Sequence, residues 1–297
     1  MDGNYEIAFL GGDVRQLTVA DYFIHRGVKV TLWGIDTRKS KDKYKMADDI
    51  SNAVESSDIC ILPLPVSNEG IRLNAPFLGE KAPRLCEVAR MIPEKNVVFG
   101  GKMPPDFVKL LEQRNIKYFD YFEDECLCIK NALLTAEAAV EIALREYRGT
   151  VDSSKSMVIG YGRIGKLLTN LLIKMNSDVT VAARKDTDIA YAECIGAVGY
   201  KLDDKNPEKI LEINNGYDIV FNTVPARLID SDIIPEINKK TIIIDLASAP
   251  GCIDIRKARD NGLMVIRALS LPGKHSPTRA GNIIAESVYN VITGLRL

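Results

Sequence analysis

The sequence predicts an α/β protein made of two doubly wound domains joined by a long connector helix. Apolar, β-branched runs alternate with helical patterns along almost the whole chain, which is typical of parallel strands joined by crossover helices. The length of 297 residues fits two domains of about 150 residues each. The two halves also repeat one pattern, because Gly11 precedes Val30 by 19 residues and Gly160 precedes Val179 by 19.

The first domain is expected over residues 1–130. Each of its apolar runs is short enough to be a buried strand and is followed by a helical pattern. The predicted strands are Glu6–Leu10, Val28–Trp33, Asp58–Leu62, Asn96–Phe99 and Ile116–Phe122.

The connector is expected over residues 131–148. Asn131–Tyr147 is rich in Ala, Leu and Glu and contains neither Gly nor Pro, which favours a long stable helix. Gly149 follows it as a natural C-terminal stop.

The second domain is expected over residues 149–280, and residues 281–297 are expected to form a helix that packs back toward the first domain. The helical pattern of this last segment covers Gly281–Leu295. The predicted strands of the second domain are Ser156–Ile159, Asp178–Ala182, Tyr217–Thr223, Thr241–Leu246 and Leu263–Ala268.

The composition excludes several classes of protein. Lys and Arg total 39 and Asp and Glu total 40, so the net charge of −1 gives no surplus of cations for nucleic-acid binding. No apolar run is long enough for a membrane span, and no export signal precedes the first strand. The six cysteines therefore predict reduced core thiols in the cytoplasm. With two histidines, His25 and His275, we expect no metal site.

A glycine motif in the second domain predicts dinucleotide binding. The strand Ser156–Ile159 runs into a Gly-x-Gly-x-x-Gly turn that opens a helix, which is the arrangement of a Rossmann fold. A pyrophosphate is then expected at the N-terminus of that helix. The motif residues are Gly160, Tyr161, Gly162, Arg163, Ile164 and Gly165.

The end of the next strand predicts NADP rather than NAD, although NAD stays possible. NAD-binding domains usually place an acid there to hold the ribose 2′-hydroxyl. Here Ala183 stands at that position, and Arg184 and Lys185 follow, which suits a 2′-phosphate. The alternative is that both cations belong to a solvated loop.

Two further strand ends belong to the same edge of the predicted sheet and are expected to line the nicotinamide half of the cofactor. The alternative is that Pro225 and Ser248 only terminate strands. The residues are Asn222, Thr223, Val224, Pro225, Leu246, Ala247 and Ser248.

The matching turn of the first domain is not expected to bind a second dinucleotide. Asp13 and Gln16 stand where the second domain has Gly162 and Gly165, and a carboxylate beside a pyrophosphate is unfavourable. We therefore expect a flavodoxin- or Rossmann-like, substrate-side domain in which Arg15 binds a carboxylate and Asp13 and Gln16 make polar contacts. A surface ion pair involving Arg15 is the alternative.

Motifs along nearly the whole chain resemble the A-subunit family of dipicolinate synthase. The most specific are GGDVRQ at Gly11, NALLTAEAA at Asn131 and IIDLASAPG at Ile243. The chain departs from the family pattern at Leu134 and Ala138, where the family tends to have Pro and Gly. It also has Thr before Arg279 where the family has Lys before Thr.

The resemblance implies NADP-dependent oxidation of dihydrodipicolinate, or of a tautomer of its hydrated precursor, to dipicolinate during sporulation. It implies that the partner is a flavoprotein-like B subunit, that the chain forms a homo-oligomer, and that it acts in the cytoplasm of the mother cell. The substrate is then a small dicarboxylate.

Five residues outside the glycine turns are candidates for substrate binding and catalysis. Lys274 and Arg279 are cations for the two carboxylates, and Thr135 reaches in from the connector. Glu137 could accept the ring proton, or could be a solvated helix carboxylate. His275 is a further acid–base candidate, or makes only a polar loop contact, because the sequence shows no orienting carboxylate for it.

Two other functions share these features. One is a shikimate-dehydrogenase-like or 2-hydroxyacid oxidoreductase, since the glycine turn and the Asn222–Pro225 segment occur in many dehydrogenases. The other is a noncatalytic NADP-binding subunit.

Overall fold

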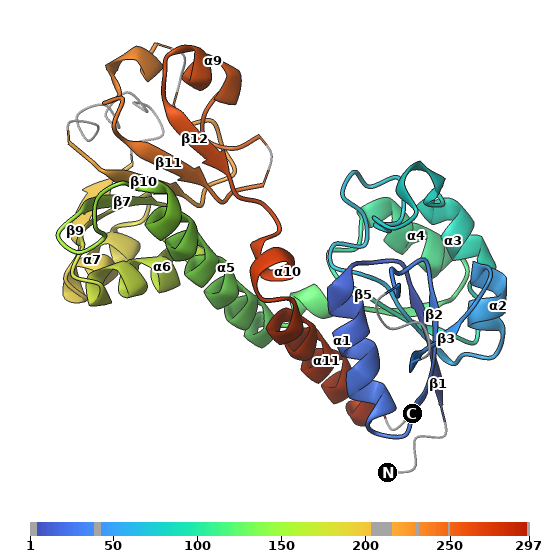
Figure 1. Ribbon diagram of the computed structural model, residues 1–297. Coiled ribbons are helices and arrows are strands. Elements are labelled where there is room, and N and C mark those ends of the chain that lie inside the picture. Colours follow the sequence, from blue (N-terminus) through green and yellow to red (C-terminus); the bar gives the residue numbers. More distant parts are fainter. Residues whose placement is uncertain (1–4, 39–42, 203–215, 230–231, 249, 296–297) are drawn as a thin grey trace. The chain divides into compact units, whose positions relative to one another are not determined.

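The chain contains two compact units, each built around one six-stranded parallel sheet (Figure 1). The computed structural model describes residues 5–38, 43–202, 216–229, 232–248 and 250–295. Unit 1 consists of Met1–Lys130 with Ser276–Leu297, and unit 2 is Asn131–His275. The α/β fold class predicted from the sequence is confirmed.

Unit 1 has the strand order β3-β2-β1-β4-β5-β6. Its strands are β1 (Glu6–Leu10), β2 (Lys29–Trp33), β3 (Lys45–Met46), β4 (Ile59–Ile61), β5 (Val97–Gly100) and β6 (Lys117–Asp120). Its crossover helices are α1 (Val14–Ile24), α2 (Ile50–Glu55), α3 (Leu85–Met91) and α4 (Pro105–Gln113), with the 3-10 turns η2 (Gly79–Lys81) and η3 (Tyr121–Glu123).

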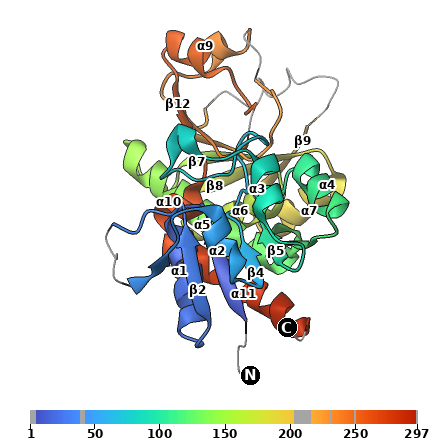
Figure 2. The same ribbon diagram turned by 90° about the vertical axis from the view of Figure 1, so that its right-hand side faces the viewer.

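The C-terminal helix α11 (Pro277–Gly294) completes unit 1 and lies beside α1, as two views show (Figures 1 and 2). The close approach depends on Gly281, because a Cβ there would lie 2.7 Å from the carbonyl oxygen of Arg15. The rings of Tyr22 and Tyr289 meet edge to face, with 5.8 Å between centroids.

Unit 2 has the strand order β12-β11-β10-β7-β8-β9. Its strands are β7 (Lys155–Ile159), β8 (Asp178–Ala183), β9 (Val198–Lys201), β10 (Ile219–Asn222), β11 (Ile242–Asp245) and β12 (Met264–Arg267). Its helices are α6 (Arg163–Lys174), α7 (Asp186–Cys194), α9 (Ile255–Asp260), α10 (Leu271–His275) and most of α5 (Glu125–Glu146), which begins in unit 1.

The two sheets share one topology. Numbering the strands of each unit in chain order gives 3-2-1-4-5-6 in both, the order of a doubly wound fold. Apolar residues cover both faces of each sheet. In β7, Val158 packs into one core cluster while Met157 and Ile159 pack into the other. Such two-sided burial explains why the strands are continuous apolar runs in the sequence.

Three local expectations were incomplete or wrong. The edge strands β3 and β9 were not predicted, because their side chains are mostly exposed and they lack an apolar run. Helix α5 starts at Glu125, before Asn131, with the Asp124 carboxylate accepting the backbone N–H of Cys126 at 2.9 Å. All six cysteines are free thiols, but Cys126 and Cys194 are exposed rather than part of the core.

The described residues contain neither a membrane-spanning helix nor a cluster of metal ligands. No helix among them is long and apolar enough to cross a membrane. Within the same residues, no group of three or more His, Cys, Asp and Glu side chains could hold a metal ion.

Candidate functional site

The turn after β7 in unit 2 takes its shape from Gly160. This residue has φ +94°, a conformation that side chains rarely adopt. A Cβ there would also strike the side chains of Thr223 and Val224. The Gly160 N–H donates to the carbonyl of Ala182 at 2.8 Å, which extends the pairing with β8 by one residue. Glycine is therefore required at the point where the chain leaves the sheet.

The next two glycines of the motif have opposite surroundings. A Cβ at Gly165 would collide with the Gly160 carbonyl oxygen, so helix and turn pack directly against each other. A Cβ at Gly162 would meet nothing within 4 Å. Gly162 is also the N-cap of α6, and within the part of the chain that the structure describes no side chain caps this helix. The first turn of α6 therefore leaves its backbone N–H groups and the positive end of its dipole available to an anion.

The end of β8 carries cations and no acid. Ala183 is buried at the position where NAD-binding domains place an acid, and Arg184 and Lys185 after it are exposed. The acids that begin α7 face lysines: Asp186 lies 2.5 Å from Lys201, and Asp188 lies 3.8 Å from Lys166.

The ends of β10 and β11 are fixed to each other by Asn222. Its Nδ2 donates to Asp245 Oδ1 at 2.8 Å, and its Oδ1 accepts the Val224 N–H at 3.0 Å. Thr223 Oγ1 donates to the Ile159 carbonyl at 2.9 Å. These two side chains hold the loop itself, so what the loop can offer a ligand is mainly its backbone.

The other predicted residues of these loops differ in exposure. Leu246 and Ala247 are buried, with 7% and 5% of their surface exposed, whereas Pro225 and Ser248 are exposed. Ala249 of the DLASAPG motif lies outside the described residues.

A buried ion pair at the same edge was not predicted from the sequence. Asp245 is fully buried, and its Oδ2 lies 3.2 Å from Arg267 Nη1 at the end of β12. Arg267 Nη1 also donates to the Pro250 carbonyl at 3.0 Å. Gly251, at φ +78°, makes room for the pair, because a Cβ there would overlap Arg267 Nη1 and Asp245 Oδ2. The signal available in the sequence was two opposite charges inside adjacent predicted strands.

In unit 1 the corresponding turn is filled by its own side chains. Asp13 is the N-cap of α1, and its Oδ1 accepts the backbone N–H of Arg15 at 3.0 Å. The same carboxylate accepts Arg15 Nε at 2.9 Å and Nη2 at 2.8 Å. Arg15 Nη2 also donates to the Leu64 carbonyl at 2.6 Å. Asp13 and Arg15 thus form an ion pair with each other. Their role in substrate binding stays a prediction.

Gln16, in the same turn, has a buried amide group whose hydrogen-bonding capacity is not satisfied by the described residues. It is 2% exposed, and neither its amide nitrogen nor its amide oxygen has a hydrogen-bond partner among the described residues. A Cβ on Gly12 would lie 2.5 Å from Gln16 Cγ, so this side chain fills the space above the turn. Nearby, Tyr121 donates to the Leu62 carbonyl at 3.0 Å, and burial raises the pKa of its hydroxyl.

The remaining predicted residues lie on helices. Thr135 Oγ1 donates to the carbonyl of Asn131 at 3.1 Å within α5, while Glu137 on the same helix is exposed. Lys274 in unit 2 and Arg279 in unit 1 are exposed. His275 has an acidic neighbour after all, since its Nδ1 lies 3.4 Å from Glu141 Oε2. The sequence could not reveal this, because the carboxylate comes from the connector helix rather than from the strand before His275.

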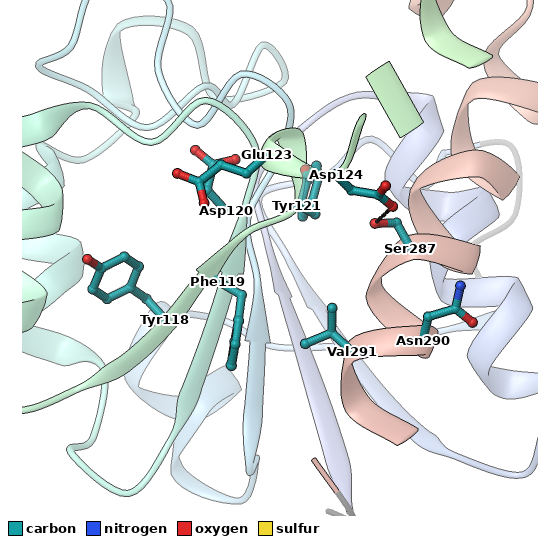
Figure 3. Close-up of a pocket in the computed structure, with 9 residues that line it drawn as sticks. All are labelled: Tyr118, Phe119, Asp120, Tyr121, Glu123, Asp124, Ser287, Asn290 and Val291. Atoms are coloured by element: carbon teal, nitrogen blue, oxygen red, sulfur yellow. Dashed lines mark hydrogen bonds between the residues drawn. The ribbon is translucent and has the colours of Figure 1, made fainter. Parts of the chain in front are cut away.

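A pocket of about 350 Å³ in unit 1 contains none of the predicted residues (Figure 3). Two of its acids already have structural roles: Asp120 accepts the N–H groups of Met103 and Phe122, and Asp124 accepts the Ser287 hydroxyl at 2.7 Å. It is lined by Tyr118, Phe119, Asp120, Tyr121, Glu123, Asp124, Ser287, Asn290 and Val291.

Comparison with known proteins gives consistent results over the whole chain. Residues 6–122 match the family model for the N-terminal domain of the dipicolinate synthase A subunit. The chain is 26% identical to the dipicolinate synthase A subunit of Bacillus subtilis (strain 168), over 98% of this chain and 97% of that protein.

Two solved structures share the fold. The crystal structure of the dipicolinate synthase A subunit from Bacillus halodurans has a TM-score of 0.83 at 24% identity, covering 97% of each chain. A transhydrogenase from Sinorhizobium meliloti has a TM-score of 0.66 at 14% identity, covering 97% of this chain and 92% of that one.

Proposed function

The chain belongs to the A-subunit family of dipicolinate synthase, and from this premise we propose that it oxidises dihydrodipicolinate, or a tautomer of its hydrated precursor, to dipicolinate with NADP⁺ as the acceptor. The observation that carries the proposal is the start of α6 at Gly162, where no side chain among the described residues caps the helix and a Cβ would meet nothing within 4 Å. We further propose a flavoprotein-like B subunit for its partner, a homo-oligomeric state, and action in the mother-cell cytoplasm during sporulation.

The residues around this turn fit a phosphorylated dinucleotide. Gly162 leaves space for a pyrophosphate, and Arg184 and Lys185 suit a ribose 2′-phosphate that the buried Ala183 does not repel. The backbone of the loops after Asn222 and Asp245 then faces the nicotinamide half. When bound, NADP⁺ supplies the hydride acceptor.

The chain must also bind two carboxylates and remove one proton. Oxidation of the dihydropyridine ring releases a hydride to the acceptor and a proton to a base, and the ring becomes aromatic. Lys274, Arg279 and Arg15 are the proposed partners of the carboxylates, with Thr135, Asp13 and Gln16 as polar contacts. Much of the rate is expected from holding the ring in position.

Two side chains are proposed for the proton. Glu137 is an exposed carboxylate with no ion-pair partner among the described residues. His275 is the second, and its Nδ1 lies 3.4 Å from Glu141 Oε2, a carboxylate that can orient the ring. Glu137→Gln and His275→Gln distinguish them, because loss of the base lowers kcat and removes its pKa from the pH dependence of the rate.

The test is an assay with the full chain, alone and with its B subunit, supplied with precursor and NADP⁺. We expect dipicolinate, detected by its ultraviolet absorbance, and one NADPH for each dipicolinate. Oxidation of a shikimate-like or 2-hydroxy acid instead would replace the proposed substrate. Tight NADPH binding without turnover in either mixture would identify a noncatalytic NADP-binding subunit.

A further inference from the structure

We propose that Arg267 is a carboxylate-binding residue of unit 2, held in place by Asp245 and presenting its guanidinium to an anionic group of the substrate. This inference rests on the proposed function for the identity of the substrate. Its physical basis is the construction of the C-terminal edge of the sheet.

Arg267 is the last of a row of residues that are paired with one another across neighbouring strands of the sheet. Asn222 is paired with Asp245, and Asp245 with Arg267, on the parallel strands β10, β11 and β12. Side chains in one such row leave the sheet on the same face. Two hydrogen bonds follow the row, from Asn222 Nδ2 to Asp245 Oδ1 at 2.8 Å and from Arg267 Nη1 to Asp245 Oδ2 at 3.2 Å.

The anchor of Arg267 is stronger than an ordinary surface pair. Asp245 has no exposed side-chain surface, and it also accepts the Ala247 N–H at 3.3 Å. Gly251 provides the space in which the pair meets, and no residue with a side chain fits there. A charge fixed in this way loses little conformational entropy when it binds a ligand.

The guanidinium is only partly used by this anchor. Both hydrogen bonds of its side chain, to Asp245 and to the Pro250 carbonyl, are made by Nη1. Nε and Nη2 have no protein partner among the residues described. The Arg267 side chain is 23% exposed. The Nε–Nη2 edge of a guanidinium carries two parallel N–H donors, which match the two oxygens of a carboxylate.

The position favours substrate over the phosphates of the cofactor. Ile159, just before the glycine turn, belongs to the same row as Asn222, and Arg267 is three strands away. At about 4.8 Å between strands, the backbone of Arg267 is roughly 14 Å from that of Ile159. The 2′-phosphate is expected still farther away, at β8 on the opposite side of β7. An anion at Arg267 therefore comes from the molecule beyond the nicotinamide.

The experiment measures dipicolinate binding to the full chain saturated with NADP⁺, by titration calorimetry. Arg267→Met removes the charge. Arg267→Lys keeps the charge but loses the two parallel N–H donors of the guanidinium. The double variant Asp245→Asn with Arg267→Met leaves no buried charge unpaired, so it carries the test if Arg267→Met fails to fold. Arg259→Met, at an exposed arginine of α9, is the matched control. Pyridine-2,6-dicarboxamide serves as the uncharged ligand.

We expect Arg267→Met and the double variant to weaken dipicolinate about ten- to hundredfold, and Arg267→Lys to weaken it less. Binding of NADPH, and of the dicarboxamide, is expected to change less than about twofold, as is every value for Arg259→Met. Dipicolinate affinity that is unchanged in the double variant, or absent in the unsubstituted chain, overturns the inference.

Failure of this inference differs from failure of the proposed function. If the chain with its B subunit makes no dipicolinate but still binds it through Arg267, the carboxylate site stands and the reaction is wrong. If dipicolinate forms with the same KM in the double variant, the reaction stands and Arg267 only supports the fold.

Discussion

The turn at Gly11 and the turn at Gly160 occupy the same place in two sheets of identical strand order, but they differ in whether a carboxylate caps the helix that follows. At Gly11 the chain provides its own anion, because the Asp13 carboxylate caps α1 and pairs with Arg15. At Gly160 no described side chain caps the helix that follows, because the N-cap of α6 is Gly162. Negative charge is favourable at the start of a helix, so the start of α6 is the one of the two that is left open to an anionic ligand.

Strand order alone therefore does not create a dinucleotide site. A second change accompanies the first: Gln16 fills the space above its turn, whereas Gly165 lets helix and turn pack together. Two substitutions therefore separate a site that is closed by side chains from one that is open to a ligand.

The largest effect is expected when the carboxylate of the unit 1 turn is introduced at the equivalent position of unit 2. Gly162→Asp should weaken NADPH more than about hundredfold, since a like charge at this contact costs several kcal/mol. The fold should persist, because a Cβ at Gly162 meets nothing and Asp is a good N-cap. Fluorescence titration with NADPH and a thermal melt measure the two effects.

Gly162→Ala is the matched control and should lose much less affinity, since it adds bulk without charge. Equal NADPH affinity in Gly162→Asp and the unsubstituted chain would show that the pyrophosphate does not bind at α6.

Removing a cation at the end of β8 tests which cofactor the open turn of unit 2 accepts. Arg184→Ala should weaken NADPH about ten- to hundredfold and leave NADH almost unchanged, because only NADPH carries the 2′-phosphate. Equilibrium titration with both nucleotides checks this, with Arg259→Ala as the control at an exposed arginine. Equal losses for NADPH and NADH would refute the assignment of NADP.

Removing the internal anion of unit 1 should cost stability rather than cofactor affinity. Asp13→Ala deletes the cap of α1 and leaves the buried Arg15 without its carboxylate, so the free energy of unfolding should fall by about 2 kcal/mol. Urea denaturation measures it. Asp13→Asn, which keeps the cap, should cost less.

Asp13→Ala should also fail to create a second NADPH site, because Gln16 still fills the space above the turn. A stoichiometry of two NADPH per chain would contradict the comparison.

The smallest effect is expected at Gln16. Its amide is buried without a partner among the described residues, so Gln16→Leu should leave stability unchanged or raise it by about 1 kcal/mol. Urea denaturation again gives the value. A clear loss of stability would mean that the amide has a partner in solution, and a loss of dipicolinate binding alone would support its predicted role toward substrate.

Much of the fold could be predicted from the sequence because buried parallel strands have short, continuous apolar sequences. The predicted strand at Thr241–Leu246 contains β11, and the one at Leu263–Ala268 contains β12. The exposed edge strands β3 and β9 carry no such signal and were missed. Helix α5 was predicted too short, because its start is marked by Asp124 rather than by the Ala-rich run.

The candidate site was predictable to a more limited extent. Glycine turns are local, so the contrast between Gly11 and Gly160 is visible in sequence. Contacts between separate elements are not, and the carboxylate near His275 was missed because Glu141 lies far from it in the chain.

Two parallel sheets and a glycine turn able to accept a phosphate could be inferred from the sequence, since strand patterns and the conformational freedom of glycine act over a few residues. The folded structure was needed to show that Asp245 faces Arg267, that Gly251 makes room for them, and that α1 is the helix of the first unit against which α11 packs. Those contacts depend on the register of strands and the packing of helices, which bring together residues far apart in the chain.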